Sequence, residues 1–318
     1  MKKHVLLATG LVLASTSAFA TTSRMTAMGQ GTDGSRYMAD TRNVWHNPAH
    51  INSMNNYVVT DWSGSAGVSR AGGNLNYGLY FNDNSHGNLV GDGTNNPARL
   101  DLFVGGSAGM DWGVRLGYDS WSAVDDGGTA FTLGFGANLN SGMSVWANLA
   151  PGSAEDIGGT ETKYGMDMGV GFSMPLMGWT FSADYGSDKG ADSVDADDNT
   201  SLSVQMGRVV EAGSGARWFT DATFSYSKTD TTTVTTVPVT FGFEADANSW
   251  LTWRGSASQS VFGNIDADGD KTSRSTFAVN AGATINLGKL KVDGTLSTAN
   301  DAVSGNSFMS QIDAHYWF

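Results

Sequence analysis

Apolar side chains occupy every second position over long stretches of this chain. Phe131, Leu133 and Phe135 are separated by Thr and Gly, and the same alternation recurs over 164–174 and 277–287. A two-residue period is that of a β-strand whose two faces meet different surroundings, whereas a helix repeats its apolar residues every three or four positions. The alternation therefore predicts an all-β protein.

Strand length separates the two architectures that contain such strands, a soluble sandwich and a membrane barrel. Sandwich strands average about five or six residues, but a tilted strand needs about nine to eleven to cross a bilayer. Most of the alternating segments have the greater length, and their second face carries Gly, Ser, Asn and Thr with some Asp and Arg. That face suits a water-filled interior better than a packed core. We therefore predict a transmembrane antiparallel up-and-down β-barrel.

The alternation places about fourteen strands. They cover 73–82, 98–107, 111–120, 129–139, 142–150, 163–174, 178–187, 200–210, 216–227, 234–245, 249–262, 273–287, 289–299 and 306–318. Short and long connections alternate between them, as in barrels with short periplasmic turns and longer outer loops. Residues 57–62 form a further candidate strand. If it joins the barrel, we expect Met25–Gly29 to supply its partner and the count to reach about sixteen, because bacterial barrels have even strand numbers.

The composition excludes several classes of protein. Apolar residues make up 40% of the chain, which is too many for a disordered protein. The absence of Cys removes disulfides and thiolate metal sites. With 31 acidic residues against 18 Lys and Arg, the formal charge is −13, so nucleic acid is not an expected partner.

The first twenty residues have the pattern of a signal peptide. Lys2 and Lys3 precede a short apolar run, and the small residues Ala18 and Ala20 flank Phe19 at the expected cleavage site. We therefore predict export to the bacterial outer membrane with cleavage after Ala20. The expected organisation is a signal peptide over 1–20, an N-terminal plug or hatch segment over 21–55, and an outer-membrane barrel over 56–318.

The last predicted strand ends the chain on an aromatic residue. Ile312, Ala314, Tyr316 and Phe318 alternate along it, which resembles the C-terminal assembly signature of bacterial outer-membrane proteins. The resemblance implies recognition by the barrel-assembly machinery through the strand that ends at Phe318, with outer-membrane lipid and lipopolysaccharide around the barrel. The sequence leaves open whether the protein forms a homo-oligomer.

The segment before the barrel carries an Asp, Asp40, followed by Asn47-Pro48-Ala49. This order resembles the N-terminal signature of the long-chain fatty-acid transporter superfamily, in which such a stretch folds into the barrel as a hatch. The resemblance implies that these four residues belong to a plug motif. The stretches SRMTAMGQ, DTRNVWHNPAHI and GNLNYGLYFN are most similar to the porin-like major outer-membrane proteins of predatory Gram-negative bacteria. From the residues alone, Asn47 is expected to cap a helix that starts at Pro48.

Charged residues recur on the face predicted to line the lumen. The candidate pore-lining residues are Arg99, Asp101, Arg115, Asp119, Asp167, Asp184, Arg217, Asp221, Glu244, Arg254, Asp293 and Asp313. With Asp111 and Lys291 the wall holds nine acids and five bases, so it is expected to favour cations weakly.

A calcium-loop pattern is incomplete in this chain. Asn264, Asp266, Asp268 and Asp270 place oxygen ligands at alternate positions, but Ser275 stands where a calcium loop has its bidentate Glu. The four residues therefore remain only a candidate calcium loop, and no metal site is predicted.

Catalytic motifs are also missing from the sequence. His46 and His50 have a spacing used by zinc ligands, but Pro48 lies between them and no third ligand is near in sequence. No Ser–His–Asp arrangement is recognisable and no cofactor motif occurs. The sequence therefore predicts a protein that is not an enzyme and has no cofactor.

The functional prediction follows from the polar lumen. We expect a porin-like passive channel for small hydrophilic solutes that is weakly cation-selective. One alternative is a plugged transporter of hydrophobic ligands of the fatty-acid type, which the Asn47-Pro48-Ala49 motif favours. A structural or surface-recognition barrel is the other.

Overall fold

The computed structural model describes residues 21–54, 56–61, 64–82, 98–122, 127–151, 154–157, 160–163, 166–188, 198–213, 215–267, 269–299 and 311–318. The predicted signal peptide lies outside these residues. Three short helices come first: the α-helix α2 (Thr22–Ala27) and the 3-10 helices η1 (Thr41–Val44) and η2 (Pro48–Ser53). In the described part of the chain, no helix combines the length and apolarity needed to cross a membrane.

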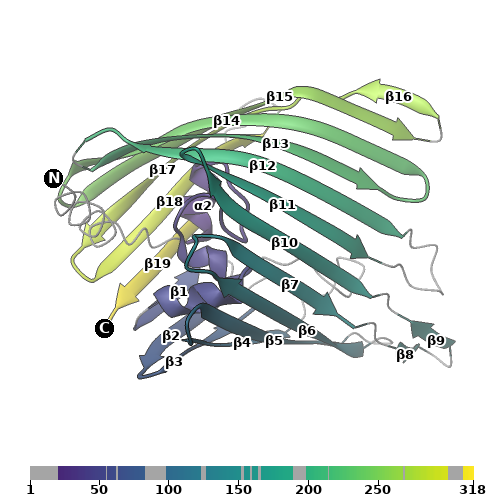
Figure 1. The fold of residues 1–318 in the computed structure, drawn as a ribbon, viewed down its shortest axis with the longest axis horizontal. Helices are drawn as coiled ribbons and strands as arrows, with labels where there is room; N and C mark the ends of the chain where they lie inside the picture. The colour runs from purple at the N-terminus through teal and green to yellow at the C-terminus, as the bar shows by residue number, and fades with distance from the viewer. Residues whose placement is uncertain are drawn as a thin grey trace.

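The rest of the described chain is almost entirely β-structure (Figure 1). The strands are β1 (Tyr57–Asp61), β2 (Ala66–Gly72), β3 (Leu75–Phe81), β4 (Ala98–Ser107), β5 (Asp111–Ser122), β6 (Gly127–Asn138), β7 (Ser144–Ala150), β8 (Ala154–Ile157), β9 (Thr160–Lys163), β10 (Asp167–Leu176), β11 (Trp179–Asp188), β12 (Asn199–Glu211), β13 (Ala216–Lys228), β14 (Thr232–Asn248), β15 (Leu251–Ala267), β16 (Asp270–Ser273), β17 (Phe277–Leu287), β18 (Leu290–Ala299) and β19 (Gln311–Trp317). Each of the fourteen predicted segments overlaps one of the longer strands, so the alternation located them correctly.

Sixteen of these strands form a closed antiparallel barrel, in which each strand pairs with the next along the chain. The ring closes between the first and last strands, where Tyr57 of β1 lies opposite Trp317 of β19. The strand β16 pairs only with the end of β15 and lies outside the ring, and β8 and β9 form a separate hairpin. The even number of strands agrees with closure of an up-and-down meander.

The estimate of about fourteen strands was two too low. The candidate strand over 57–62 does join the barrel as β1, but its other neighbour is β2, which the alternation did not reveal. Met25–Gly29, the expected partner, instead overlaps helix α2 and the turn after it. In this helix Met25 and Met28 pack against the inner wall, beside Phe219 of β13. A strand in the ring would itself be part of the wall and would not reach this position.

Short and long connections alternate around most of the barrel, as predicted, but the connection from β13 to β14, on the side of the longer loops, has only three residues, 229–231. β4 to β5, β10 to β11 and β17 to β18 are joined by turns of two or three residues, while the connections from β3 to β4 and from β11 to β12 are longer. We call the two ends of the barrel the short-turn end and the long-loop end. The β14–β15 ladder has a register shift at Pro238, where the missing N–H of proline interrupts the pairing.

Apolar side chains cover the outer surface of the barrel. Leu116 is 48% exposed, and Phe135, Val170 and Trp253 are exposed in the same outward register. The aromatic residues Tyr118, Tyr185, Trp218 and Tyr316 are exposed too. Exposure of so much apolar surface to water is unfavourable, so this outer surface matches a barrel that is surrounded by lipid.

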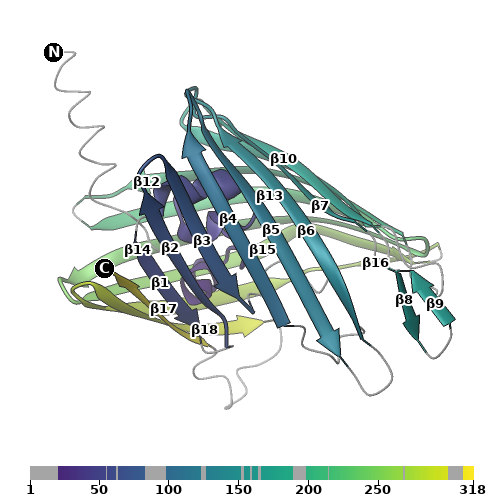
Figure 2. The ribbon, with the colours of Figure 1, turned by 90° about the horizontal axis from the view of Figure 1, so that it is seen from below.

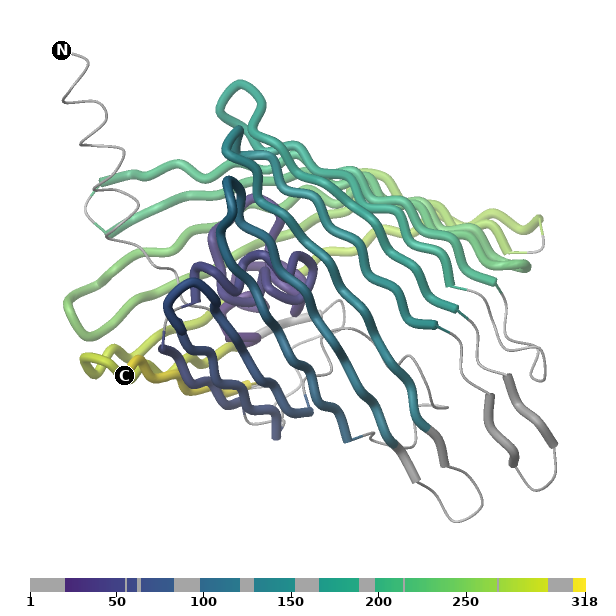
Figure 3. The backbone as a smooth tube through the Cα atoms, turned by 60° about the horizontal axis from the view of Figure 1, so that its bottom comes forward, coloured from purple at the N-terminus to yellow at the C-terminus, as the bar shows by residue number. Residues whose placement is uncertain are grey.

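Residues 21–54, which we call the N-terminal segment, pack on the inside of the ring. The helix α2 contacts β15, β17, β18 and β19, and η2 contacts β3, β4, β5 and β6. Figures 2 and 3 show this purple segment surrounded by strands of the barrel. The buried core of the molecule therefore lies between the segment and the inner wall, not between two sheets.

Candidate functional site: the barrel interior

The N-terminal segment is held in the interior by a buried arginine. Arg24 of α2 donates to Asp40 Oδ2 at 2.5 Å and to Glu244 Oε2 of β14 at 2.8 Å. All three side chains are largely buried. Burial lowers the pKa of Arg24, but Glu244 and Asp40 outweigh it and raise that pKa above its usual value. Burial raises the pKa of Asp40 to about 6, although Arg24 acts in the opposite direction. Arg24 therefore links two parts of the N-terminal segment to each other and also links the segment to the barrel wall.

Further charges extend this cluster along the wall near the short-turn end. Arg217 donates to Glu244 Oε1, and Arg254 Nε lies 3.1 Å from Glu244 Oε2. Arg254 also donates to Asp293 Oδ1 at 3.1 Å, and His315 Nδ1 lies 3.4 Å from the other oxygen of that carboxylate. Each of these candidate pore-lining residues thus has a charged partner, so its charge is largely neutralised in place.

A second ion-pair cluster lies on β4 and β5. Asp101 accepts hydrogen bonds from Arg99 Nε at 3.0 Å and from Arg115 Nε at 2.8 Å, and Asp119 Oδ1 lies 3.4 Å from Arg99 Nε. The guanidinium of Arg115 also lies over the ring of Trp45, 4.9 Å from its centroid. Because all four charged side chains are almost fully buried, this part of the wall is packed against the segment and does not line open water.

The middle of the N-terminal segment contacts the opposite wall. Arg36 bridges Asp33 and Asp184 of β11, with distances of 2.9 and 3.4 Å. Tyr37 donates its hydroxyl to Asp221 Oδ2 of β13 at 2.7 Å. Burial, followed by the negative charge of Asp221, raises the pKa of Tyr37, so its hydroxyl remains a donor. Sequence reasoning missed Arg36 and Tyr37 because no motif marks them.

The plug-motif residues start the two 3-10 helices. Asp40 caps η1 by accepting from the Arg42 N–H, and Asn47 caps η2 by accepting from the Ala49 N–H at 3.0 Å. Pro48 occupies the first turn of η2, as expected. The side-chain amide of Asn47 also donates to Asn138 of β6 at 2.8 Å. The structure thus explains the Asn-Pro-Ala order as a helix start that is bonded to the barrel wall.

Glycines in the wall make room for η2. Gly105 of β4, Gly113 of β5 and Gly136 of β6 are direct cross-strand neighbours, and we call them the glycine row. A Cβ at Gly113 would lie 2.2 Å from the Pro48 oxygen, and one at Gly136 would lie 1.9 Å from Asn47 Oδ1. Any larger residue in the row would therefore displace η2, which is the usual reason for Gly where two backbones approach closely.

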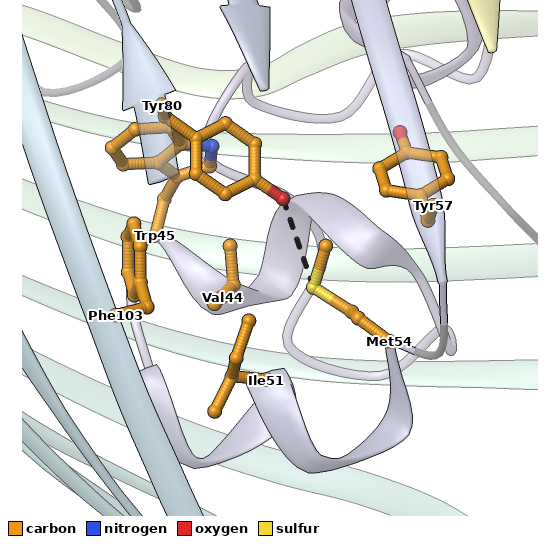
Figure 4. Packing of buried hydrophobic residues seen from close by; sticks show 7 residues of the cluster. All are labelled: Val44, Trp45, Ile51, Met54, Tyr57, Tyr80 and Phe103. Atoms are coloured by element: carbon orange, nitrogen blue, oxygen red, sulfur yellow. Dashed lines mark hydrogen bonds between the residues drawn. The ribbon is translucent and has the colours of Figure 1, made fainter. Parts of the chain in front are cut away.

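An apolar cluster completes the contact between the segment and β1, β3 and β4 (Figure 4). Trp45 packs edge-on against Tyr80 and Phe103, with ring centroids 5.2 and 5.3 Å away. The hydroxyl of Tyr80 lies 3.9 Å from Met54 Sδ. Every buried member of this cluster is at most 4% exposed, so its apolar surface is already covered by the protein's own side chains.

The inner face of β12 and β13 towards the long-loop end is less covered. Ser203, Gln205, Thr223 and Ser225 alternate there with exposed, outward-facing Leu202, Met206 and Phe224, and each of the four keeps an intermediate exposure. At the same end, Asp167 of β10 lies directly opposite Asp188 of β11. Of the predicted pore-lining residues, Asp167, Asp221 and Asp313 have no ion pair in the described part of the chain, and Asp167 lies nearest the mouth at the long-loop end. The polar groups that remain open to water are therefore hydroxyls, an amide and a few carboxylates near the barrel mouth.

The candidate calcium loop is a hairpin in the described residues. Asn264 and Asp266 belong to β15, Asp270 begins β16, and Asp266 Oδ2 lies 3.7 Å from Lys271 Nζ. Asp268 lies outside the described residues. Asn264, Asp266 and Asp270 therefore belong to the β15–β16 hairpin.

The two histidines of the N-terminal segment are neighbours, with ring centroids of His46 and His50 5.8 Å apart. The ring of His46 packs edge-on against Trp146. Burial lowers the pKa of His50 to about 4. No group of three His, Cys, Asp or Glu side chains suited to a metal ion occurs among the residues that the structure describes.

Comparisons with known proteins bear on the fold. No protein-family model and no curated protein sequence matches the chain. A bacterial polysaccharide outer membrane secretin is similar, with a TM-score of 0.54 and 9% identity over 80% of this chain and 89% of the other. CdiB from Escherichia coli is also similar, with a TM-score of 0.51 and 13% identity over 82% of this chain, which spans 62% of that protein. An anion-selective porin from Comamonas acidovorans matches with a TM-score of 0.40 and 11% identity, over 82% of this chain and 98% of the porin. The chain therefore has the β-barrel fold of bacterial outer-membrane proteins.

Proposed function

We propose that the protein is a passive outer-membrane channel for small hydrophilic solutes, with weak selectivity for cations. The observation that carries the proposal is the partly exposed, polar inner face of β12 and β13, where Ser203, Gln205, Thr223 and Ser225 face the interior. Such a wall replaces part of the hydration of a polar solute. The carboxylates of Asp167 and Asp188 near the mouth raise the local concentration of cations.

In this proposal the N-terminal segment is a partial plug. It fills the interior beside β3–β6, β15 and β17–β19 and leaves the hydroxyl-bearing wall of β12 and β13 partly exposed. The segment also carries Arg24, Arg36 and Arg42 against Asp33 and Asp40, so it offsets one unit of the negative charge of the wall. The expected cation preference is accordingly modest.

The proposed setting follows from the predicted export signal and the outer surface. We propose that the chain is cleaved after Ala20, assembled through the strand that ends at Phe318, and surrounded by outer-membrane lipid and lipopolysaccharide. The exposed apolar band that includes Leu116 and Phe135 supports contact with hydrocarbon.

A transporter of hydrophobic ligands of the fatty-acid type is the second candidate. The similarity of Asp40 and Asn47-Pro48-Ala49 to that superfamily's signature favours it, together with the apolar cluster around Trp45. Because that cluster is filled by the protein's own side chains, a ligand would have to displace part of the segment. We therefore rank the passive channel first.

Recording in planar lipid bilayers tests the proposal. The purified protein should show steady single-channel currents and a small reversal potential of the cation sign across a KCl gradient. The preference should weaken at 1 M salt, where the screening length falls to about 3 Å. A protein without steady conductance that retains a fatty acid or detergent on purification would favour the transporter, and a protein with neither would favour a recognition barrel.

Paired substitutions locate the source of selectivity. Changing Asp167 and Asp188 to Asn together should move the reversal potential towards zero, because both carboxylates lie at the long-loop end. Glu211→Gln, at the exposed short-turn end of β12, is the matched control and should change it less. If Glu211→Gln moves the reversal potential as far as the double change does, Asp167 and Asp188 are not the source of the selectivity.

Deletion of residues 21–55 tests the plug. The sixteen barrel strands begin at Tyr57, so the ring keeps all of its strand pairs. We expect a higher single-channel conductance with the β-sheet circular dichroism retained. If the shortened protein inserts and conducts like the parent, the segment does not obstruct the pore.

A further inference from the structure

Three carboxylates lie side by side on the inner wall next to the start of α2. Asp61 of β1 is directly opposite Asp313 of β19, and Asp313 is directly opposite Asp293 of β18. We call these three residues the carboxylate row. Like charges at directly opposed positions destabilise a sheet unless cations compensate them. Asp293 has Arg254 as such a partner, at 3.1 Å.

Asp313 lacks a cation in the described part of the chain. Asp313 is 1% exposed. One of its carboxylate oxygens, Oδ2, accepts a hydrogen bond from the Ser23 N–H at 2.6 Å. Among the described residues its Oδ1 has no hydrogen-bond partner. A buried carboxylate with an unsatisfied oxygen is costly, so this position can accept a further donor, and a cationic donor would also offset its negative charge.

Thr21 lies at the same place. Its hydroxyl donates to Asp293 Oδ2 at 2.8 Å, and Ser23, two residues later, bonds to Asp313. The Thr295 hydroxyl donates to the Ser23 carbonyl and fixes this turn. Thr21 is therefore held beside the carboxylate row by hydrogen bonds from residues 21 and 23 to two of its members, Asp293 and Asp313.

We propose that cleavage after Ala20 creates the missing cation, and that the new α-ammonium group of Thr21 forms a buried ion pair with Asp313. Signal peptidase adds water across the Ala20–Thr21 bond, which leaves a carboxylate on Ala20 and an amine on Thr21. The α-amino group has a usual pKa of about 7.7–8.0, so it takes up a proton at neutral pH and gains three donors. Removal of the signal peptide thus completes the anchor of the N-terminal segment, a role beyond solute passage.

Chemical labelling of the amine tests this pairing. The mature chain 21–318, refolded into lipid vesicles, is treated near pH 7 with an amine-reactive ester, and peptides are analysed by mass spectrometry. We expect the Thr21 amine to react at least about tenfold more slowly in the folded protein than in urea, because a paired, buried ammonium is not nucleophilic. Lys289, which is exposed, should react in both states. If Thr21 reacts in the folded protein as fast as Lys289, the proposal is wrong.

A double-variant cycle identifies the partner. N-terminal acetylation removes the charge, and it should lower the ratio of folded to unfolded protein by about tenfold in the parent but by less than about twofold in Asp313→Asn. Asp119→Asn, a buried carboxylate paired with Arg99 elsewhere, should keep the full effect of acetylation. Equal effects in the parent and in Asp313→Asn would overturn the pairing. If Asp313→Asn does not fold, the labelling result on the parent decides.

A third test identifies the N-terminal residue of the protein purified from outer membranes. Intact mass should place it at Thr21, and any other start would contradict the proposal. None of these measurements depends on conductance, so they stand or fall separately from the proposed channel.

Discussion

At Arg24, one guanidinium joins parts of the chain that are 16 and 220 residues away in sequence. Its side chain is 3% exposed, and Asp40, one of its two acceptors, is fully buried. The attraction between such buried charges adds less to the stability of the protein than their separation would remove, because a buried carboxylate would be left without its cation.

Arg24→Gln should therefore destabilise the protein markedly. Loss of the cation leaves Asp40 buried without its partner, at a cost of about 3–5 kcal/mol in urea unfolding from lipid vesicles. Burial already raises the pKa of Asp40 above its usual value, and the folded state of the variant favours the protonated carboxyl. The deficit should accordingly be larger at pH 8 than at pH 5.

Two further variants control this prediction. Adding Asp40→Asn to Arg24→Gln should recover part of the lost stability, because it removes the stranded charge. Arg36→Gln, whose side chain is 20% exposed, should cost much less. An equal loss in both single variants would mean that burial of the charge is not the cause.

Among the elements, η2 and the three strands beneath it, β4, β5 and β6, are in close contact. The glycine row removes the side chains of β4, β5 and β6 where the backbone of Pro48 passes. Glycine costs conformational entropy in a strand, and here that cost is offset by a contact between backbones that no other residue permits.

Gly113→Val should displace η2 without altering the ring of strands. Its branched side chain would occupy the place of the Pro48 carbonyl. We expect increased conductance and faster proteolysis within the N-terminal segment. Gly169→Val is the matched control, since a Cβ at this inward-facing glycine of β10 meets only one atom within 4 Å, at 3.9 Å. If the two variants conduct alike, η2 does not limit the pore.

The sequence was sufficient for most elements, but not for the contacts in the interior. Long alternation located fourteen strands, since lipid and water impose opposite demands on the two faces. It missed β2, whose seven residues AGVSRAG place only small groups beside Val68 and Arg70. The inward register of Gly105, Gly113 and Gly136 was visible as a pattern, yet its meaning depends on which backbone comes close. Pairs such as Arg24 with Glu244 carry no local signal at all.

On the scale of the whole molecule, two surfaces of opposite chemistry share one wall. The outer one is apolar, whereas the inner one is largely charged or hydroxyl-bearing and adds a few buried rings such as Phe103 and Phe219. Leu116→Arg places a cation on the outer face in the middle of β5, where the expected cost is about 2–4 kcal/mol in vesicles. Ser203→Arg, on the inner face, should cost little. Comparable losses in refolding assays would be inconsistent with a lipid-facing exterior.

Closure of the barrel by β1 and β19 sets an order for assembly. The surface for η2 belongs to β3–β6, which lie early in the sequence, whereas α2 contacts β15 and β17–β19, which lie near its end. The segment can therefore dock at one end before the ring exists, and its other end becomes fixed only as the ring shuts. A chain whose ring closed first would have to bring residues 21–54 in through one end of the barrel. The segment is thus expected to enter the interior before the last strands close the ring.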